Sequence, residues 1–89
     1  LERFIVENKD STKLIFAISP EYGKKDDTMF RPLKELCEKY EIPLLNHYCD
    51  SVFANHPVWF SNINHLNQDG AFVYSSRIAQ EIDSIIALQ

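Results

Sequence analysis

The run Lys13-Leu14-Ile15-Phe16-Ala17-Ile18-Ser19 is apolar throughout its centre and is stopped by Pro20. An apolar run of this length without polar alternation is typical of a strand that is buried on both faces, as in a parallel sheet. Pro20 and Gly23 then break the regular structure, which predicts a loop. A buried strand over residues 13–19 is therefore the feature from which the expected fold follows.

The segment after this loop has the spacing of an amphipathic helix. Asp27 and Thr28 are both good N-cap residues, and Pro32 is tolerated in the first turn, so the regular part is expected to begin near Phe30. The residues expected on the buried face recur at helical spacing: Leu33, Leu36, Cys37 and Tyr40. The helix is expected to end near the last of these.

Residues 41–46 are short and apolar, with Pro43 near their start, and predict a second strand. Strand, helix and strand in this order form a βαβ unit with a right-handed crossover. Two parallel strands flanked by helices leave both sheet edges open. Further strands would come from upstream sequence, from a second copy of the chain, or from an antiparallel contribution by residues 3–7. Residues 1–10 are otherwise read as the end of an upstream element running into a loop.

The last third of the chain predicts a long connection and a terminal helix. Residues 47–61 are rich in aromatic and polar side chains, and residues 50–55 suit a helical turn within them. Asn67 is the expected cap of the final helix, Asp69 lies in its first turn, and Gly70 predicts a close approach to a neighbour. The positions expected to be buried along this helix are Ala71, Tyr74, Ile78, Ile82 and Ile85.

Composition excludes some classes of function. The 89 residues carry 13 acidic against 9 basic side chains, a formal charge of −4, and no basic stripe. We therefore expect no nucleic-acid partner. No apolar run approaches the ~18 residues that span a bilayer, and Leu1-Glu2-Arg3 does not look like a signal peptide or a natural start. Cys37 and Cys49 match no zinc or redox spacing, so both are expected as unpaired thiols.

The stretch Asn62-Ile63-Asn64-His65-Leu66-Asn67-Gln68-Asp69-Gly70-Ala71 holds the clearest functional signal. It resembles the last conserved block of the SGNH/GDSL hydrolases, in which an Asp-x-x-His pair is followed by Leu-Asn-x-x-Gly-Ala and a terminal helix. Here the pair reads Asn62-x-x-His65. The resemblance covers roughly residues 13–88 and corresponds to the C-terminal part of such a domain, without the nucleophile half.

This resemblance implies an α/β fold, namely a partial three-layer flavodoxin-like sandwich built on a βαβα unit with a short parallel sheet. Residues 1–89 would then form a single partial domain. In such enzymes a serine attacks an ester, so the resemblance implies an ester hydrolase or O-acyltransferase acting, for example, on an acylated carbohydrate. His65 would be the general base and Asn62 its orienting partner. The resemblance implies no cofactor, and enzymes of this type are often exported or in the cell envelope.

Two departures from the family pattern affect this reading. An asparagine at position 62 can accept a hydrogen bond from the imidazole, but it cannot stabilise the imidazolium that forms in catalysis. A different orienter, such as Asp50, is the alternative. The nucleophile is also missing, because no Gly-Asp-Ser block occurs and the two glycines are Gly23 and Gly70. The serine and the oxyanion donors would come from sequence outside this chain.

Other interpretations remain open. A zinc site could use His47, Cys49 and His65 as ligands, although their spacing matches no established pattern. Residues 56–60 could wall an acyl or sugar pocket, or could simply pack in the core. From a different class of function, the chain could be a non-catalytic α/β module whose Trp59 and Phe60 surface binds a partner or pairs copies of the chain.

Overall fold

The computed structural model describes residues 1–88 of the chain. The α-helices are α1 (Glu2–Asn8), α2 (Arg31–Lys39), α3 (Ser51–Ala54) and α4 (Gln68–Ala87). The strands are β1 (Phe16–Ile18), β2 (Leu44–Asn46), β3 (Phe60–Asn62) and β4 (His65–Leu66). Two 3₁₀ turns, η1 (Thr28–Phe30) and η2 (Pro57–Trp59), precede α2 and β3. The chain is therefore a mixed α/β structure, as expected.

The predicted parallel pair is confirmed. β1 and β2 pair in parallel, in a register that places Phe16 opposite Leu44 and Ile18 opposite Asn46. Both strands are shorter than predicted, with three residues each. Pro43 has no backbone N–H, and its carbonyl accepts from the Phe16 N–H at 3.0 Å at the start of the ladder. Within residues 1–88 each of these strands has one partner, so each keeps an unpaired edge.

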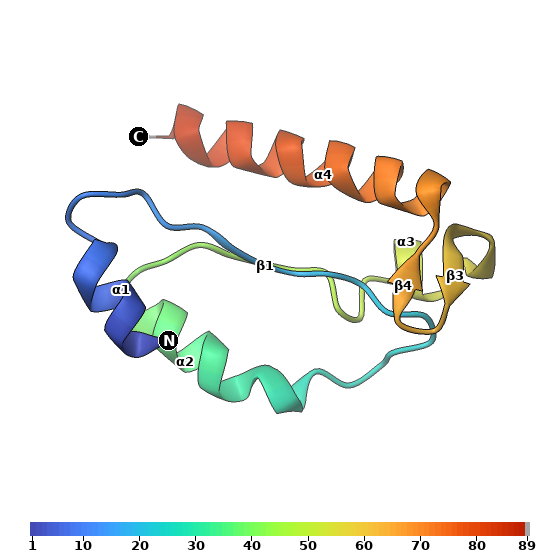
Figure 1. Ribbon diagram of the computed structural model, residues 1–89, viewed down its shortest axis with the longest axis horizontal. Coiled ribbons are helices and arrows are strands. Elements are labelled where there is room, and N and C mark those ends of the chain that lie inside the picture. The colour runs from blue at the N-terminus through green and yellow to red at the C-terminus, as the bar shows by residue number, and fades with distance from the viewer. Residues whose placement is uncertain (89) are drawn as a thin grey trace.

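Helices lie on both sides of this small sheet (Figure 1): α1 and α2 on one side and α4 on the other. α2 begins after η1 with Pro32 in its first turn, as predicted. The main apolar cluster joins Ile5, Cys37 and Ile42. Half-buried side chains packed against it are Leu14, Phe16, Leu33, Leu36, Tyr40 and Leu44. The core thus lies between β1–β2 and the first two helices.

The N-terminal segment corrects the sequence interpretation. Residues 1–10 were interpreted as the end of an upstream element running into a loop, with no regular structure assigned, or as an antiparallel strand over residues 3–7. Glu2–Asn8 forms α1, so the strand alternative was wrong. Ile5 is its one fully buried side chain, so the segment shows no apolar stripe from which a helix could be predicted. Glu2 accepts hydrogen bonds from Lys39 at the end of α2 and from Tyr40, which follows it, and these add a polar attachment to the apolar one.

The final helix begins at its predicted cap but is less buried than expected. The Asn67 side chain accepts a hydrogen bond from the Gly70 N–H at 2.9 Å, which confirms the cap. Tyr74, Ile78, Ile82 and Ile85 are half-buried, whereas Ala71 is exposed, so the prediction that Ala71 is buried was wrong. A two-stranded sheet is too narrow to cover one face of a 20-residue helix.

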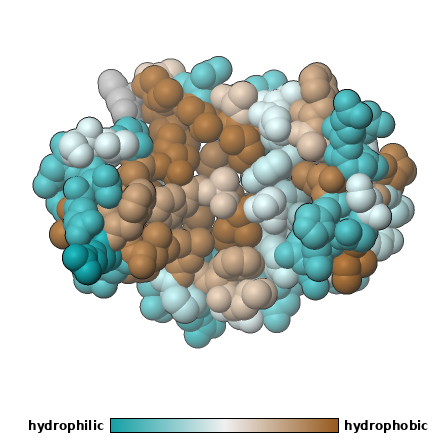
Figure 2. Space-filling view, in the orientation of Figure 1, coloured by the Kyte–Doolittle hydropathy of each residue, from teal (hydrophilic) through white to brown (hydrophobic). Residues whose placement is uncertain are grey.

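Much apolar surface consequently stays accessible. Figure 2 shows apolar side chains over a broad part of the visible face, between the levels of α4 and α2 in Figure 1. Exposed large apolar residues include Phe4, Met29, Val58, Phe72 and Ile86. Among residues 1–88, no helix has both the length and the hydrophobicity needed to cross a membrane.

Candidate functional site

The candidate histidine lies on a short β-hairpin rather than in an irregular loop. β3 and β4 pair antiparallel, with Phe60 opposite Leu66, Asn62 opposite His65 and an irregularity between the two pairs. At the base of the hairpin, hydrogen bonds join Asn67, the cap of α4, to η2. Asn67 donates its backbone N–H to the Trp59 carbonyl at 2.8 Å and its side-chain amide to the Val58 carbonyl at 2.6 Å. One residue thus caps α4 and fixes the hairpin against η2.

The predicted close approach at Gly70 is confirmed. A Cβ atom at this position would overlap the Trp59 carbonyl oxygen and would lie 2.8 Å from the Trp59 Cβ and 3.0 Å from the Leu66 Cδ2. Glycine is therefore required because the start of α4 lies directly on the backbone of η2. This contact sets the position of the hairpin relative to the helix.

The structure brings the two predicted site residues together. The His65 Nδ1 atom lies 2.9 Å from the Asn62 Oδ1 atom, and the same oxygen accepts the Asn64 backbone N–H at 2.9 Å. A backbone N–H can only donate, so the Asn62 atom between them must be the carbonyl oxygen. His65 Nδ1 must then carry the hydrogen. The neutral imidazole is consequently held in the tautomer whose Nε2 has a free lone pair.

This lone pair is available to a reactant. Asn62 and His65 are both exposed. Within residues 1–88, the side chain of His65 makes a single hydrogen bond, the one to Asn62. No serine, threonine or cysteine of that part of the chain is hydrogen-bonded to Nε2. Within residues 1–88 the site therefore presents an oriented imidazole with no hydroxyl or thiol bonded to its second nitrogen.

Two open grooves lie away from His65. One of about 420 Å³ is lined by residues 9–14 together with Tyr40, Glu41 and Ile42. The other, of about 510 Å³, follows β2 beside α2 and is lined by Lys34, Cys37, Glu38, Glu41, Ile42, Pro43, Leu44 and Asn46. Both grooves adjoin β2 or the segments next to it.

The aromatic stretch before the hairpin is mainly packing. Trp59 stacks on His56 with ring centroids 4.8 Å apart and lies against Phe53, 5.5 Å away. Phe60 contacts Tyr22 at 5.8 Å. Phe53 is fully buried, so these rings build a second small core around α3 and η2. Of residues 56–60, Val58 is the large apolar side chain that remains exposed.

The structure does not support the alternative roles for His47, Cys49 and Asp50. Among residues 1–88 no group of three His, Cys, Asp or Glu side chains could hold a metal ion, so the zinc interpretation was wrong. Asp50 does not orient His65, because its Oδ2 atom lies 2.7 Å from Nδ1 of His47. Both cysteines are free, as predicted, and burial raises the pKa of the Cys37 thiol.

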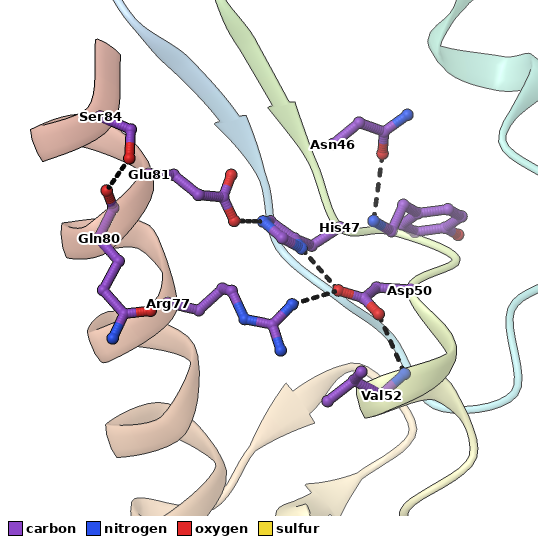
Figure 3. A network of polar contacts seen from close by, with 9 residues as sticks. Asn46, His47, Asp50, Val52, Arg77, Gln80, Glu81 and Ser84 are labelled. Carbon is purple, nitrogen blue, oxygen red and sulfur yellow. Dashed lines mark hydrogen bonds and ion pairs between the residues drawn. The ribbon is translucent and has the colours of Figure 1, made fainter. Parts of the chain in front are cut away.

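A polar network that the sequence did not reveal surrounds His47 (Figure 3). His47 is buried, with Asp50 on Nδ1 and the Glu81 Oε1 atom 2.7 Å from Nε2. The second contact is close enough for an ion pair but is not aligned as a hydrogen bond. Arg77 Nη1 lies 3.7 Å from the Asp50 Oδ2 atom. The one sequence signal was the i,i+4 pair of Arg77 and Glu81 on α4.

The network also changes the acidity of its members. Burial alone would raise the pKa of Asp50, but the hydrogen bonds from His47 and from the Val52 N–H outweigh it and lower that pKa. Tyr74, also packed against His47, has its pKa raised by burial and by the nearby Glu81 carboxylate. The end of β2, the cap of α3 and the middle of α4 thus meet in one cluster of charges.

Comparisons with known proteins do not assign this arrangement to a family. No protein-family model matches the sequence, and neither the curated proteins nor the solved structures gave a significant match.

Proposed function

We propose that this chain is the C-terminal part of an SGNH-like ester hydrolase or O-acyltransferase, in which His65 is the general base and Asn62 its orienter. The observation that carries the proposal is the shared Asn62 oxygen. It accepts from both the Asn64 N–H and His65 Nδ1, so that in the neutral ring the nitrogen without hydrogen is Nε2, on an exposed side chain. A base needs this tautomer to take a proton from a serine.

The reaction follows from these roles. A serine hydroxyl, supplied by polypeptide outside residues 1–89, attacks the ester carbonyl while Nε2 of His65 takes its proton. The imidazolium then gives that proton to the departing alkoxide, leaving an acyl-serine. Water, in a hydrolase, or an acceptor hydroxyl, in a transferase, attacks the acyl group in the same way. An ester of a carbohydrate is a substrate class that fits this chemistry.

Asn62 makes this base weaker than a histidine paired with a carboxylate. The amide oxygen fixes the tautomer through its dipole, but it carries no charge to stabilise the imidazolium. We therefore expect slow turnover. His65 would still act as the base and Asn62 as its orienter, but kcat would be lower than for an enzyme with an Asp-His pair.

The incomplete sheet agrees with this proposal. β1 and β2 each have a free edge, with α1 and α2 on one side and α4 on the other. Additional parallel strands beside them would complete a three-layer flavodoxin-like sandwich. In such a sheet the new strands would end at the same edge as β1 and β2, where a nucleophile and oxyanion donors would be placed.

Hydrolysis of p-nitrophenyl acetate by a protein that joins residues 1–89 to their upstream sequence tests the proposal. We expect His65→Ala to lower kcat by about a hundredfold or more, the usual contribution of a general base. His56→Ala is the matched control, because His56 is exposed and stacks on Trp59. Equal activity of the His65→Ala variant and the parent protein would exclude His65 as the base.

A non-catalytic, self-pairing module is the second candidate, and the outer edge of β1 favours it. Phe16 donates its N–H toward β2, and Ile18 accepts there from the His47 N–H. Since alternate residues direct their backbone groups to opposite sides, the N–H and C=O of Ala17 face away from β2. Ala17 is exposed, and no charged side chain or proline lies within β1 to block pairing with another strand.

Sedimentation of this chain at high concentration tests the second candidate. Self-pairing through β1 predicts a dimer that Ala17→Pro disrupts, because proline removes the outward N–H but none of the hydrogen bonds to β2. Ala17→Val keeps that N–H and should remain dimeric. A monomeric parent chain, or a dimer that tolerates the proline, would reject pairing through this edge.

A further inference from the structure

His47 lies between two carboxylates from different parts of the chain. It follows β2 directly, and its side chain is only 9% exposed. Asp50, the cap of α3, and Glu81, on α4, each place an oxygen 2.7 Å from one of its two ring nitrogens. In Figure 3 the three side chains form one continuous row from α4 to α3.

The contacts of the two ring nitrogens indicate whether His47 is neutral or charged. A neutral imidazole has one N–H and one lone pair. With Nδ1–H donating to Asp50, a neutral ring would leave Nε2, which makes no hydrogen bond, 2.7 Å from a Glu81 carboxylate oxygen in a place of low exposure. Only the imidazolium places a positive charge beside both carboxylates, as a hydrogen bond to Asp50 and as an ion pair with Glu81.

We propose that doubly protonated His47 fastens α4 to the end of β2, and that loss of this proton frees the C-terminal half of the helix. Within residues 1–88, two side chains of α4 beyond its first turn make polar contacts with other elements: Glu81 and Arg77. The remaining contacts of that half are half-buried apolar ones. The helix is therefore held there by a charged latch and a thin apolar layer.

The neighbouring charges support a proton-dependent latch. The groups that face His47 are Asp50 from the α3 cap and Tyr74 and Glu81 from α4, and Arg77 of α4 reaches Asp50. With His47 protonated, its positive charge and that of Arg77 balance the two carboxylates. Loss of the proton leaves one negative charge in excess at a site of low exposure. The helix is the element that can move away to expose Glu81 to water.

Hydrogen exchange of the α4 amides tests this inference. Protection factors, corrected for the intrinsic effect of pH, are compared below and above the pH at which nitrogen NMR shows that the His47 ring loses its proton. We expect protection over residues 78–87 to fall about tenfold at the higher pH, because the ion pair with Glu81 is lost while the hydrogen bond to Asp50 remains. The first turn of α4, held by Asn67 and Gly70, should change little.

Two variants separate the latch from a general effect of pH. Glu81→Gln replaces the carboxylate by an amide that can donate to a neutral ring, so its protection should no longer depend on pH. Asp83→Asn removes an exposed carboxylate from the same helix and should behave as the parent chain. Equal protection at both pH values in the parent chain would overturn the inference, and so would an unchanged pH effect in Glu81→Gln.

A direct observation of the ring covers the case in which Glu81→Gln does not fold. Nitrogen NMR of the parent chain distinguishes an imidazolium from either neutral tautomer. We expect both ring nitrogens of His47 to carry hydrogen at pH 6, even though the ring is buried. A neutral His47 ring at that pH would overturn the inference. None of these measurements depends on whether His65 acts as a catalytic base.

Discussion

Gly70, in the first turn of α4, lies so close to the Trp59 backbone of η2 that no side chain fits between them. Gly70→Ala should therefore destabilise the fold even though alanine is the better helix former by ~1 kcal/mol. The overlap with backbone atoms is expected to cost about 1–3 kcal/mol, as overpacking usually does, and to exceed that gain. Chemical denaturation measures the difference.

Ser75→Ala is the control for that substitution, because Ser75 is exposed on the same helix. It should change stability by no more than about 0.5 kcal/mol. A Gly70→Ala variant as stable as the parent chain would mean that η2 and α4 can separate without loss.

The cap of α4 gives a second prediction. Asn67→Ala removes the acceptor for the Gly70 N–H and the donor to the Val58 carbonyl. Loss of a helix cap costs about 1 kcal/mol, and the lost attachment to η2 adds to it. Thermal or chemical unfolding should detect a total loss of about 1–2 kcal/mol. Asn55→Ala removes an exposed asparagine whose side chain makes no hydrogen bond within residues 1–88, and should have little effect.

The lowered pKa of Asp50 leads to a prediction of how the free energy of unfolding depends on pH. Despite its burial, hydrogen bonds from His47 and the Val52 N–H keep the pKa of Asp50 below its ordinary value. A carboxyl whose pKa is lower in the folded state stabilises the fold above its unfolded pKa of about 3.9, and this stabilisation is lost as the pH falls through the folded pKa. The free energy of unfolding should therefore decrease on acidification below about pH 5.

The Asp50→Asn variant isolates that contribution. Asparagine can still cap α3 but does not titrate, so the decrease on acidification should be smaller in the variant. Asp83→Asn again serves as the control, since Asp83 is exposed and lies outside this network. Parallel acid-unfolding curves for Asp50→Asn and the parent chain would contradict the role given to Asp50.

Local patterns explain how much of this arrangement the sequence could predict. The apolar runs predicted the parallel pair, and the Asn67 cap and Gly70 predicted the start of α4, because each depends on residues close in sequence. The Asn62 and His65 contact was found for the same reason, since the two residues lie opposite each other on one hairpin.

Contacts between distant segments account for what was missed. α1 is held by one buried side chain, Ile5, and by Glu2 on α2, which a periodicity search cannot detect. The His47 network joins residues 47–50 to residues 77–81. Ala71 was expected to be buried because the helical pattern gives the face but not the width of the sheet that covers it.

Asn62→Asp tests the weak point of the proposed catalytic pair. A carboxylate can accept from the Asn64 N–H and from His65 Nδ1, as the amide does, and it also stabilises the imidazolium formed in the reaction. In a protein that includes the nucleophile segment, this substitution should raise kcat, up to about the ten-thousandfold that separates Asp from Asn in serine proteases. Asn64→Asp, which adds a charge without contacting the ring through its side chain, is the control. An unchanged or lower kcat in Asn62→Asp would contradict the assignment.

The most direct measurement is covalent labelling by a fluorophosphonate, which reacts with a serine activated by a base. It is applied to a protein that joins residues 1–89 to their upstream sequence, and to its His65→Ala and His56→Ala variants. The account predicts labelling of the parent protein and of His56→Ala, with labelling lost in His65→Ala. Failure to label the parent protein, or equal labelling of the His65→Ala variant, would contradict the role of His65.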